Sequence, residues 1–370
     1  MSDSSPNKFL AKLYAHENNR PSNEITASDP IATPSPSLNW SIDGGIRPGG
    51  FYCFEGPESS GKSFIALCCV AELLKKDKDS IALWFDAEGA FSVHFLNILL
   101  PDVEDQKRLV VASSKGGMKG TDIFDYFNSE VLSMAQDGLK IAAVVVDSLQ
   151  MIIAPKEANL KSTGDHLMGD LSSYLPKALR LISGPSKPRL KEGFVGIPWI
   201  FISQVRDNLD PSAAYTGKKY NISGGRAFRH ALDVEILFEI IESKKTRIYG
   251  EEHKNMNDSA VQIGHRVRST VQKNKFGPPK RVAEFDLIYD VGIVNQAAEI
   301  ASLGIRLGLI TKDGITYYYG TEKLAVGEPK TIELLASRPD IQDKIMFEVF
   351  NKKPEAINVS IQTGQETNLA

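Results

Sequence analysis

The sequence predicts an α/β protein with a mostly parallel, twisted sheet, and two observations lead to this prediction. From residue 40 to about residue 293, short apolar runs of strand length alternate with helix-length segments, as parallel strands joined by crossover helices require. A glycine-rich segment at 56–63 lies between the first of these runs and an unbroken apolar run of helix length. The 370 residues are 42% hydrophobic, which is ample for a packed core.

The expected strands are short apolar runs bounded by polar residues or glycine. They are Gly50–Phe54, Ile81–Phe85, Leu109–Ala112, Ile141–Val146, Trp199–Ile202, Val234–Ile240, Val267–Gln272 and Ala283–Ile288. Helix-length segments separate the first five strands, whereas the last three follow one another closely. Because closely spaced strands are joined by hairpins rather than by crossovers, we expect the sheet to end in antiparallel strands.

The segment 1–37 precedes this core, which we place at 38–293. Residues 5–17 predict a short amphipathic helix, and 20–37 has the proline-rich composition of a linker. A tethered helix of this kind packs either on its own core, which is the commoner arrangement, or on a neighbouring subunit. Its apolar side chains are Phe9, Leu10, Leu13 and Tyr14.

The segment 294–350 follows the core and predicts a small α/β lobe. It contains a helix over Ala297–Leu307, a hairpin around Lys312–Gly314 and another helix that starts at Thr331. The polar tail 351–370 is expected to be disordered.

Composition excludes several classes of protein. No apolar run reaches the length that a membrane span needs, so we expect no membrane partner. The three cysteines, Cys53, Cys68 and Cys69, show no disulfide or metal-binding spacing and indicate a reducing, cytoplasmic setting. The six histidines are scattered singly, so Mg²⁺ is the metal that we expect.

Positive charge is concentrated in two segments although the net charge is −3. The segment 266–281 carries six Lys and Arg residues and no acid, and the segment 206–229 carries five against two acids. Charge alone leaves two interpretations open, which are a nucleic-acid surface and an ordinary solvated face.

The glycine-rich segment matches the pattern G-x-x-x-x-G-K-[ST], in the strand-turn-helix context where this pattern binds phosphate. We expect loop amides and the helix N-terminus to bind the phosphates of a nucleoside triphosphate, Lys62 to reach the outer phosphates, and the Ser63 hydroxyl to bind Mg²⁺. The expected nucleotide-binding residues of the loop are Gly56, Pro57, Glu58, Ser59, Ser60, Gly61, Lys62 and Ser63.

Four further features lie at strand ends, where open α/β sheets bind ligands. Asp147 ends an apolar run and suits Mg²⁺, and Glu88 is placed to activate the water that attacks the γ-phosphate. Gln204 is a candidate sensor of that phosphate. Lys273 and Lys275 share one face of a strand, and they could complete a phosphate site from a neighbouring subunit.

These motifs together resemble the bacterial RecA recombinase family over most of the chain. The matching segments are Gly56–Ser63, Asp86–Glu88, Val146–Ser148, Gly164–Gly169, Ser223–Gly225 and Lys273–Lys275. The resemblance implies a RecA-type P-loop core, an ATP-dependent helical filament on single-stranded DNA, and homologous pairing and strand exchange with duplex DNA in recombinational repair. It also implies repressor or mediator proteins as further partners.

The resemblance also assigns DNA-binding residues. It places one DNA-binding loop at 152–168 and another at 205–225. Met168 and Leu209 would wedge between base triplets, with Tyr215 as the alternative to Leu209. The residues expected to face DNA phosphates are Arg180, Arg206, Gly224, Gly225 and Arg226.

The chain departs from the family pattern in ways that fit a divergent member, such as one that a bacteriophage encodes. In the adenine pocket, Ser92 and Phe95 replace the usual Asp and Tyr, so ring stacking is kept while a base-reading hydrogen bond is lost. His230 replaces an aromatic residue that couples subunits, and 242–264 resembles an insertion. These departures leave an alternative function, an ATP-gated DNA-binding filament that recruits or activates a partner without strand exchange. A ring-shaped helicase-like motor fits the sequence less well.

Overall fold

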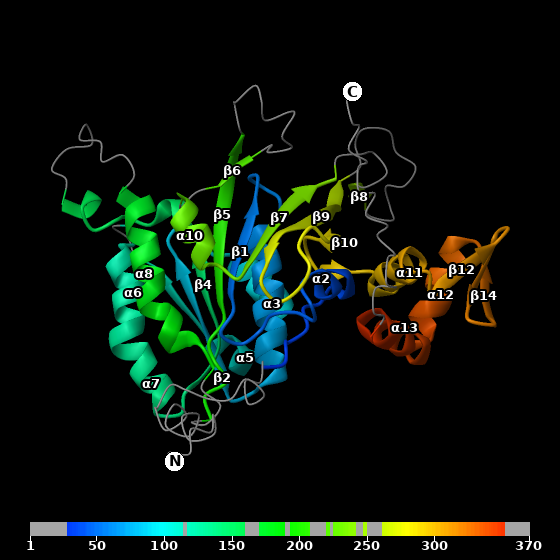
Figure 1. Ribbon diagram of the computed structural model, residues 1–370, viewed down its shortest axis with the longest axis horizontal. Coiled ribbons are helices and arrows are strands. Elements are labelled where there is room, and N and C mark those ends of the chain that lie inside the picture. The colour runs from blue at the N-terminus through cyan, green and yellow to red at the C-terminus, as the bar shows by residue number, and fades with distance from the viewer. Residues whose placement is uncertain are drawn as a thin grey trace, which may run out of the picture.

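A twisted eleven-stranded sheet forms the centre of the protein (Figure 1). The structure is a computed structural model that describes residues 28–113, 117–159, 170–188, 193–207, 220–222, 225–241, 247–249 and 261–351. The expected helix at 5–17, the tail after Asn351 and parts of both expected DNA-binding loops lie outside these ranges.

The strand order is β11-β10-β9-β7-β1-β5-β4-β2-β3, with β6 paired to β5 and β8 paired to β9. The strands are β1 (Phe51–Gly56), β2 (Ser80–Asp86), β3 (Leu109–Ser113), β4 (Lys140–Asp147), β5 (Trp199–Asp207), β6 (Tyr220–Ile222), β7 (Val234–Ile240), β8 (Arg247–Tyr249), β9 (Gln262–Asn274), β10 (Val282–Ile288) and β11 (Gly292–Val294). All eight expected strands are therefore confirmed.

The stretch of the sheet from β7 to β3 is parallel, and β9, β10 and β11 are antiparallel, as expected from the close spacing of the last strands. The sequence did not predict β6, β8 and β11. Each has three residues, too few to show the alternation on which a strand prediction depends.

Helices cover both faces of the sheet (Figure 1). One face packs against α3 (Lys62–Lys76) and α4 (Val93–Leu99). The other packs against α6 (Gly120–Tyr126), the π-helical turn η2 (Phe127–Val131), α7 (Leu132–Gln136), α8 (Asp170–Ser186) and α10 (Gly225–Ala231). Shorter elements are α5 (Val103–Lys107), η3 (Leu149–Met151) and η4 (Glu157–Asn159).

Strand β1 shows why the core has two halves. Its side chains alternate, so Tyr52 and Phe54 join the cluster under α3, while Phe51 and Cys53 join the cluster on the opposite face. In the second cluster the fully buried Trp199 contacts the rings of Phe51, Phe124, Phe127 and Phe201. The strand that precedes the glycine-rich loop is thus buried on both sides, which fixes where the loop begins.

The C-terminal residues form a separate small core with a three-stranded antiparallel sheet (Figure 1). Its elements are α11 (Gln296–Arg306), β12 (Ile310–Asp313), β13 (Thr316–Tyr319), β14 (Glu322–Val326), α12 (Glu328–Ser337) and α13 (Pro339–Asn351). The sequence predicts the first helix and the hairpin correctly. It predicts one extended helix from Thr331, whereas α12 ends at Ser337 and Pro339 begins a new helix, because proline is favoured in a first helical turn and disfavoured in an interior.

The segment before the core also differs from the linker that its prolines predict. Ile31 pairs with Ile46, and the Ser35 side chain caps helix α2 (Pro36–Ser41). Buried Glu299 of α11 accepts hydrogen bonds at one oxygen from the Ser35 and Ser37 hydroxyls, at 2.5 Å each, and from the Ser37 amide at 3.0 Å. This carboxyl group joins α2 to the C-terminal lobe.

Stability should depend on pH through Glu299. Burial raises its pKa to about 7 from an ordinary 4.5, although the serine hydrogen bonds oppose the shift. Because the folded chain holds this proton more tightly than the unfolded chain, the contribution to stability is full below pH about 4.5 and is lost as the pH rises through about 7. The free energy of unfolding of the wild type should therefore fall by about 3 kcal/mol between those pH values. Glu299→Gln should not show this fall, because glutamine does not titrate.

Urea denaturation at pH 5, 6, 7 and 8 measures this effect. The free energy of unfolding of Glu299→Gln, relative to that of the wild type, should increase as the pH rises. The exposed Glu333→Gln control should have the same pH dependence as the wild type. A Glu299→Gln variant that keeps the wild-type pH slope would contradict the assignment.

Candidate active site

The glycine-rich loop connects the end of β1 at Gly56 to the start of α3 at Lys62. Gly61 has a φ of 84°, and a Cβ there would lie 2.7 Å from a Leu287 methyl carbon. A Cβ on Gly56 would clash with the Phe238 carbonyl oxygen. Gly61 at the N-cap makes no side-chain capping bond, so the first amides of α3 are left without a side-chain cap. A helix start with uncapped amides and a positive dipole end is suited to phosphate.

Lys62 is buried at the base of this loop. Its Nζ donates hydrogen bonds to the Pro57 carbonyl at 2.6 Å and to Ser60 Oγ at 3.4 Å. Burial lowers its pKa to about 8, and the carboxylates of Asp147, Glu88 and Glu58 oppose that shift. A cation held in a buried loop beside uncapped amides attracts a polyanion, as the sequence predicts.

Asp147 ends β4 beside the loop and is 7% exposed. Burial raises its pKa to about 6, while the hydroxyl of Ser63 next to it lowers the pKa. Asp147 Oδ1 has no hydrogen-bond partner among the described residues. A buried carboxylate oxygen without a partner, beside a hydroxyl, is a donor set that Mg²⁺ accepts, so Ser63 and Asp147 fit the expected metal.

Glu88 is held next to Asp147 by the backbone. The amides of Ala87 and Glu88 donate to the Asp147 carbonyl at 2.8 and 3.1 Å, which ties the end of β2 to the end of β4. The Asp86 carboxylate then accepts hydrogen bonds from the amides of Gly89, Ala90 and Phe91. Asp86 therefore shapes the loop that carries the exposed Glu88, a role that the sequence did not indicate.

Gln204 lies directly opposite Gly56 in the pairing of β1 with β5. The same strand continues to Arg206 and Asp207 and pairs there with β6. Gln150, which the sequence did not single out, donates from Nε2 to Ser203 Oγ at 2.9 Å and to the Gln204 carbonyl at 2.8 Å. Gln204 is thus fixed between the glycine-rich loop and the β5–β6 hairpin, which rises above the sheet in Figure 1.

These residues line one cavity of about 400 Å³. Its polar lining residues include Lys62, Ser63, Glu88, Asp147 and Gln204, and its lining also contains Phe95, His265, Leu287 and Tyr289. Phe95 stacks on Phe64 with ring centroids 4.3 Å apart. Ser92 caps α4 by accepting from the Phe95 amide, so its hydroxyl has a structural role. Tyr289 follows a predicted strand, so the strand-end rule could have found it.

The structure does not bring Lys273 and Lys275 to this cavity. Lys273 Nζ donates to the carbonyl oxygens of Arg229, His230 and Leu232 at the end of α10. Lys275 pairs with Asp233 at 3.0 Å, and Asp233 in turn accepts from the Phe51 amide. Lys275 therefore lies beside the start of β1, about 16 Å along the strand from Gly56. Lys273 lies two strands from β1 at the level of Cys53, and its ammonium group points away from the loop, to the end of α10.

The expected DNA-binding residues are placed in part. Met168, Leu209 and Gly224 lie outside the described residues. Arg206 is exposed on β5, Arg226 is exposed in the first turn of α10, and Arg180 is exposed on α8. Gly225 has a φ of 74°, and a Cβ there would lie 3.6 Å from Ser172, so the starts of α10 and α8 are neighbours.

The basic segment 266–281 is largely neutralised by acids on adjacent elements. Arg266 pairs with Asp286, Arg268 with Glu284, Lys275 with Asp233 and Arg281 with Asp43. In the second basic segment, Arg229 pairs with Glu235, whereas Arg206 and Arg226 have no such ion pair within the described ranges, and neither has Arg180 on α8. The charge pattern therefore favours the second basic segment over the first as a surface for a polyanion.

The loop, the carboxylates and the open α/β sheet define a P-loop nucleoside triphosphatase. The RecA N-terminal domain matches residues 20–294. The chain is 32% identical to Protein RecA of Leptospira meyeri over 325 residues, which is 87% of this chain and 74% of that protein. It is 30% identical to Protein RecA of Chlorobium chlorochromatii over 320 residues, covering 86% and 80% of the two chains. For a Nostoc Protein RecA the identity is 28% over 338 residues, covering 91% and 85%.

The chain therefore belongs to the RecA family. It is a divergent member, and as a member it is a DNA-dependent ATPase of DNA recombination and repair. None of the helices in the described ranges is long and apolar enough to cross a membrane.

Glu88→Gln separates nucleotide binding from hydrolysis. The amide keeps the size of the side chain but cannot take a proton from water, so ATP should still bind within about twofold while turnover falls by about 10²- to 10⁴-fold. Phosphate release with single-stranded DNA and binding of a fluorescent ATP analogue measure the two effects. Lys62→Ala should lose binding itself, and exposed Glu104→Gln should change neither. Wild-type turnover by Glu88→Gln would rule out this carboxylate as the base.

Proposed function

We propose that this protein assembles with ATP and Mg²⁺ into helical filaments on single-stranded DNA, pairs them with homologous duplex DNA and exchanges strands. One observation supports this most directly. Gln204 lines the nucleotide cavity, and Arg206 follows it by two residues on the same strand. A change at the γ-phosphate therefore has a path of two residues to a cation that can contact DNA.

The residues of the cavity divide the work of hydrolysis among them. The α3 amides and Lys62 would hold the phosphate chain, and Ser63 and Asp147 would hold Mg²⁺. The metal would there supply positive charge to neutralise the charge that develops on the transferred phosphoryl group. Glu88 orients the attacking water and accepts its proton, and the Gln204 amide donates a hydrogen bond toward the γ-phosphate.

DNA contacts are proposed for the surface where β5, β6 and the starts of α8 and α10 meet. Arg206 and Arg226 would bind backbone phosphates, with Gly225 allowing close approach of the chain. Arg180 is ten residues into α8, about 15 Å from its start, so it would contact the strand further along. Met168, Leu209 and Gly224, which lie outside the described residues, are also proposed to contact DNA.

The lysines support a site that is shared between subunits. Lys275 lies about 16 Å along the strand from its own glycine-rich loop, and Lys273 lies two strands away from β1 with its ammonium group held at the end of α10. Lys275 is exposed and Lys273 is half-buried, so both can be reached from outside the chain. We therefore assign them to the phosphates of the adjacent subunit's ATP.

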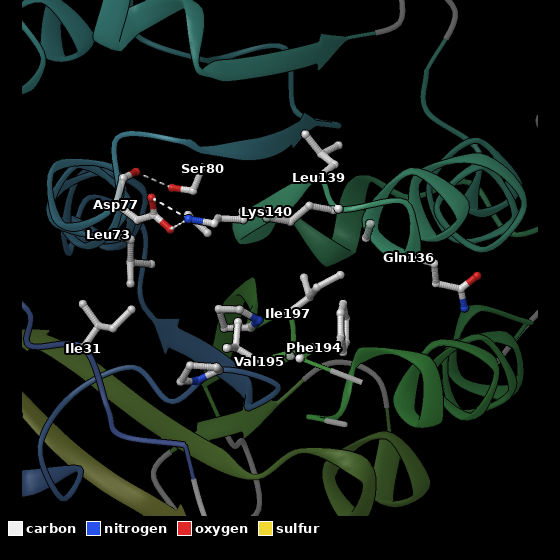
Figure 2. A pocket seen from close by; sticks show the side chains of 18 residues that line it. Ile31, Leu73, Asp77, Ser80, Gln136, Leu139, Lys140, Phe194, Val195 and Ile197 are labelled. Carbon is white, nitrogen blue, oxygen red and sulfur yellow. Dashed lines mark hydrogen bonds and ion pairs between the residues drawn. The ribbon is translucent and has the colours of Figure 1, made fainter. Parts of the chain in front are cut away.

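A groove at the N-terminal ends of the parallel strands, opposite the nucleotide cavity, supports filament assembly (Figure 2). It has a volume of about 460 Å³, and its apolar lining includes Ile31, Leu139, Phe194, Val195 and Ile197. The described chain begins beside it, because the Ser28 hydroxyl donates to the Val195 carbonyl at 3.2 Å.

We assign this groove to the apolar face of residues 5–17 of a neighbouring subunit. Residues 18–27 give that segment a tether of up to about 35 Å, which is long enough to leave its own core.

The three cysteines are free and buried, which supports the cytoplasmic setting proposed for the protein.

Strand exchange tests the proposed function against the alternative of a filament that only recruits a partner. Labelled oligonucleotides should exchange with ATP and should not exchange with ADP or without nucleotide. Arg206→Ala should weaken binding of single-stranded DNA. It should also reduce by about one the slope of the logarithm of the binding constant against the logarithm of the salt concentration. ATP-dependent filaments without exchange would favour the alternative, and closed rings in electron micrographs would favour a motor.

Mixing two inactive variants tests the shared site. Lys62→Ala lacks its own phosphate site but can donate its lysines, whereas Lys273→Ala has the opposite defect. A one-to-one mixture should recover a substantial fraction of ATP turnover, because some interfaces combine two intact halves. Adding Leu13→Asp to both variants should prevent recovery by blocking assembly. A mixture that stays inactive, although both variants keep wild-type melting temperatures, would place the lysines in their own subunit's mechanism.

A further inference from the structure

His265 is a buried polar side chain in the nucleotide cavity with one nitrogen unused. It lies near the start of β9, is 3% exposed and lines the cavity. Its Nε2 has no hydrogen-bond partner among the described residues and lies 4.0 Å from the position that a Cβ would take on Gly61. A buried nitrogen without a partner is costly, and the open cavity is where a partner can come from.

The neighbours of His265 favour one position for its ring proton. Gln262 Nε2 donates to the Gly264 carbonyl at 3.0 Å, which sets the orientation of the amide, and its second hydrogen goes to Tyr289 Oη at 3.3 Å. Tyr289 accepts that bond and can pass its own hydrogen to His265 Nδ1, 3.1 Å away. Burial lowers the pKa of His265, which favours the neutral ring. When Nδ1 of a neutral ring accepts from Tyr289, the single ring proton lies on Nε2.

The immediate neighbours of His265 are an apolar and an aromatic side chain. Leu287 is its register partner and Tyr289 its hydrogen-bond partner, and Phe95 lines the same cavity. His94 pairs with Asp290 at 2.8 Å, which joins α4 to the turn after β10. Apolar and aromatic neighbours suit a base or sugar better than a phosphate, and the Ser92 hydroxyl is already used to cap α4.

We propose that His265 is a specificity-determining residue whose Nε2–H donates a hydrogen bond to an acceptor on the nucleoside part of the bound triphosphate. The acceptor is a purine ring nitrogen or a sugar oxygen. Tyr289 is the positioning residue that holds His265 in the tautomer able to donate. This inference rests on the proposed ATP site and adds to it the group that reads the nucleoside.

Binding to the full-length protein without DNA tests the proposal. His265→Leu removes the donor at similar volume, and His265→Gln keeps a donor. His265→Leu should weaken binding of Mg-ATP by about three- to tenfold, His265→Gln should restore most of it, and neither should change binding of Mg-tripolyphosphate, which has no nucleoside. Unchanged ATP affinity, or an equal loss for both ligands, would overturn the proposal.

The same ligands separate failure of this inference from failure of the ATP site. If tripolyphosphate binding did not depend on Lys62, the proposed nucleotide site itself would be wrong, whatever His265 does. Analogues locate the acceptor. The analogues are 3-deaza-ATP, 7-deaza-ATP and 2′-deoxy-ATP. The analogue that lacks the acceptor atom should bind the wild type as weakly as ATP binds His265→Leu. Its affinity should not fall further in the His265→Leu variant. Full additivity of every analogue with His265→Leu would contradict a nucleoside contact.

Nitrogen NMR of histidine-labelled protein tests the role of Tyr289. The resonance that disappears in His265→Gln should show the Nε2–H tautomer in the wild type. Tyr289→Phe should shift it toward a mixture of tautomers, and Tyr318→Phe in the C-terminal lobe should not. A wild-type ring protonated at Nδ1 would refute the positioning role.

Discussion

The parallel register of the central strands is the constraint on which the site depends. Gly56 is opposite Gln204, and Asp86 is opposite Asp147, because β1, β5, β4 and β2 run in the same direction and end at one edge. A shift of one residue in either pair would turn a side chain of the candidate site to the other face of the sheet. The buried aromatic residues on both sides of β1 oppose such a shift. Hydrophobic packing thus determines the chemistry at the edge.

Burial gives this edge its electrostatic character. It lowers the pKa of Lys62 and raises the pKa of Asp147, so neither charged group is stabilised fully by its surroundings. In the proposed complex, a triphosphate beside Lys62 and a divalent cation beside Asp147 would supply the opposite charges that these groups lack. Ligand binding would then relieve a cost that folding imposes, in a cavity where charge interactions are stronger than in water.

The sequence was most informative where a residue type has one dominant use. The glycine-rich pattern and the strand-terminal Asp147, Glu88 and Gln204 were expected at one edge of a parallel sheet, and the structure brings them into one cavity. It was least informative where a role depends on distant neighbours. The bonds from Gln150 to β5 and from Tyr289 to His265 join segments more than twenty residues apart, and no local pattern encodes them. The alternating lysines suggested a phosphate site, but their place away from the glycine-rich loop follows from sheet topology.

Lys273 has a consequence for how assembly and DNA binding are joined. Its ammonium group closes the last turn of α10, the helix whose first turn carries Arg226. An ammonium group that moves to a neighbour's phosphate must give up those carbonyl oxygens. Three backbone acceptors would then exchange their cation for water, and α10 would lose its C-terminal restraint. Contact between subunits at Lys273 would in this way loosen α10, the helix that presents Arg226 to DNA.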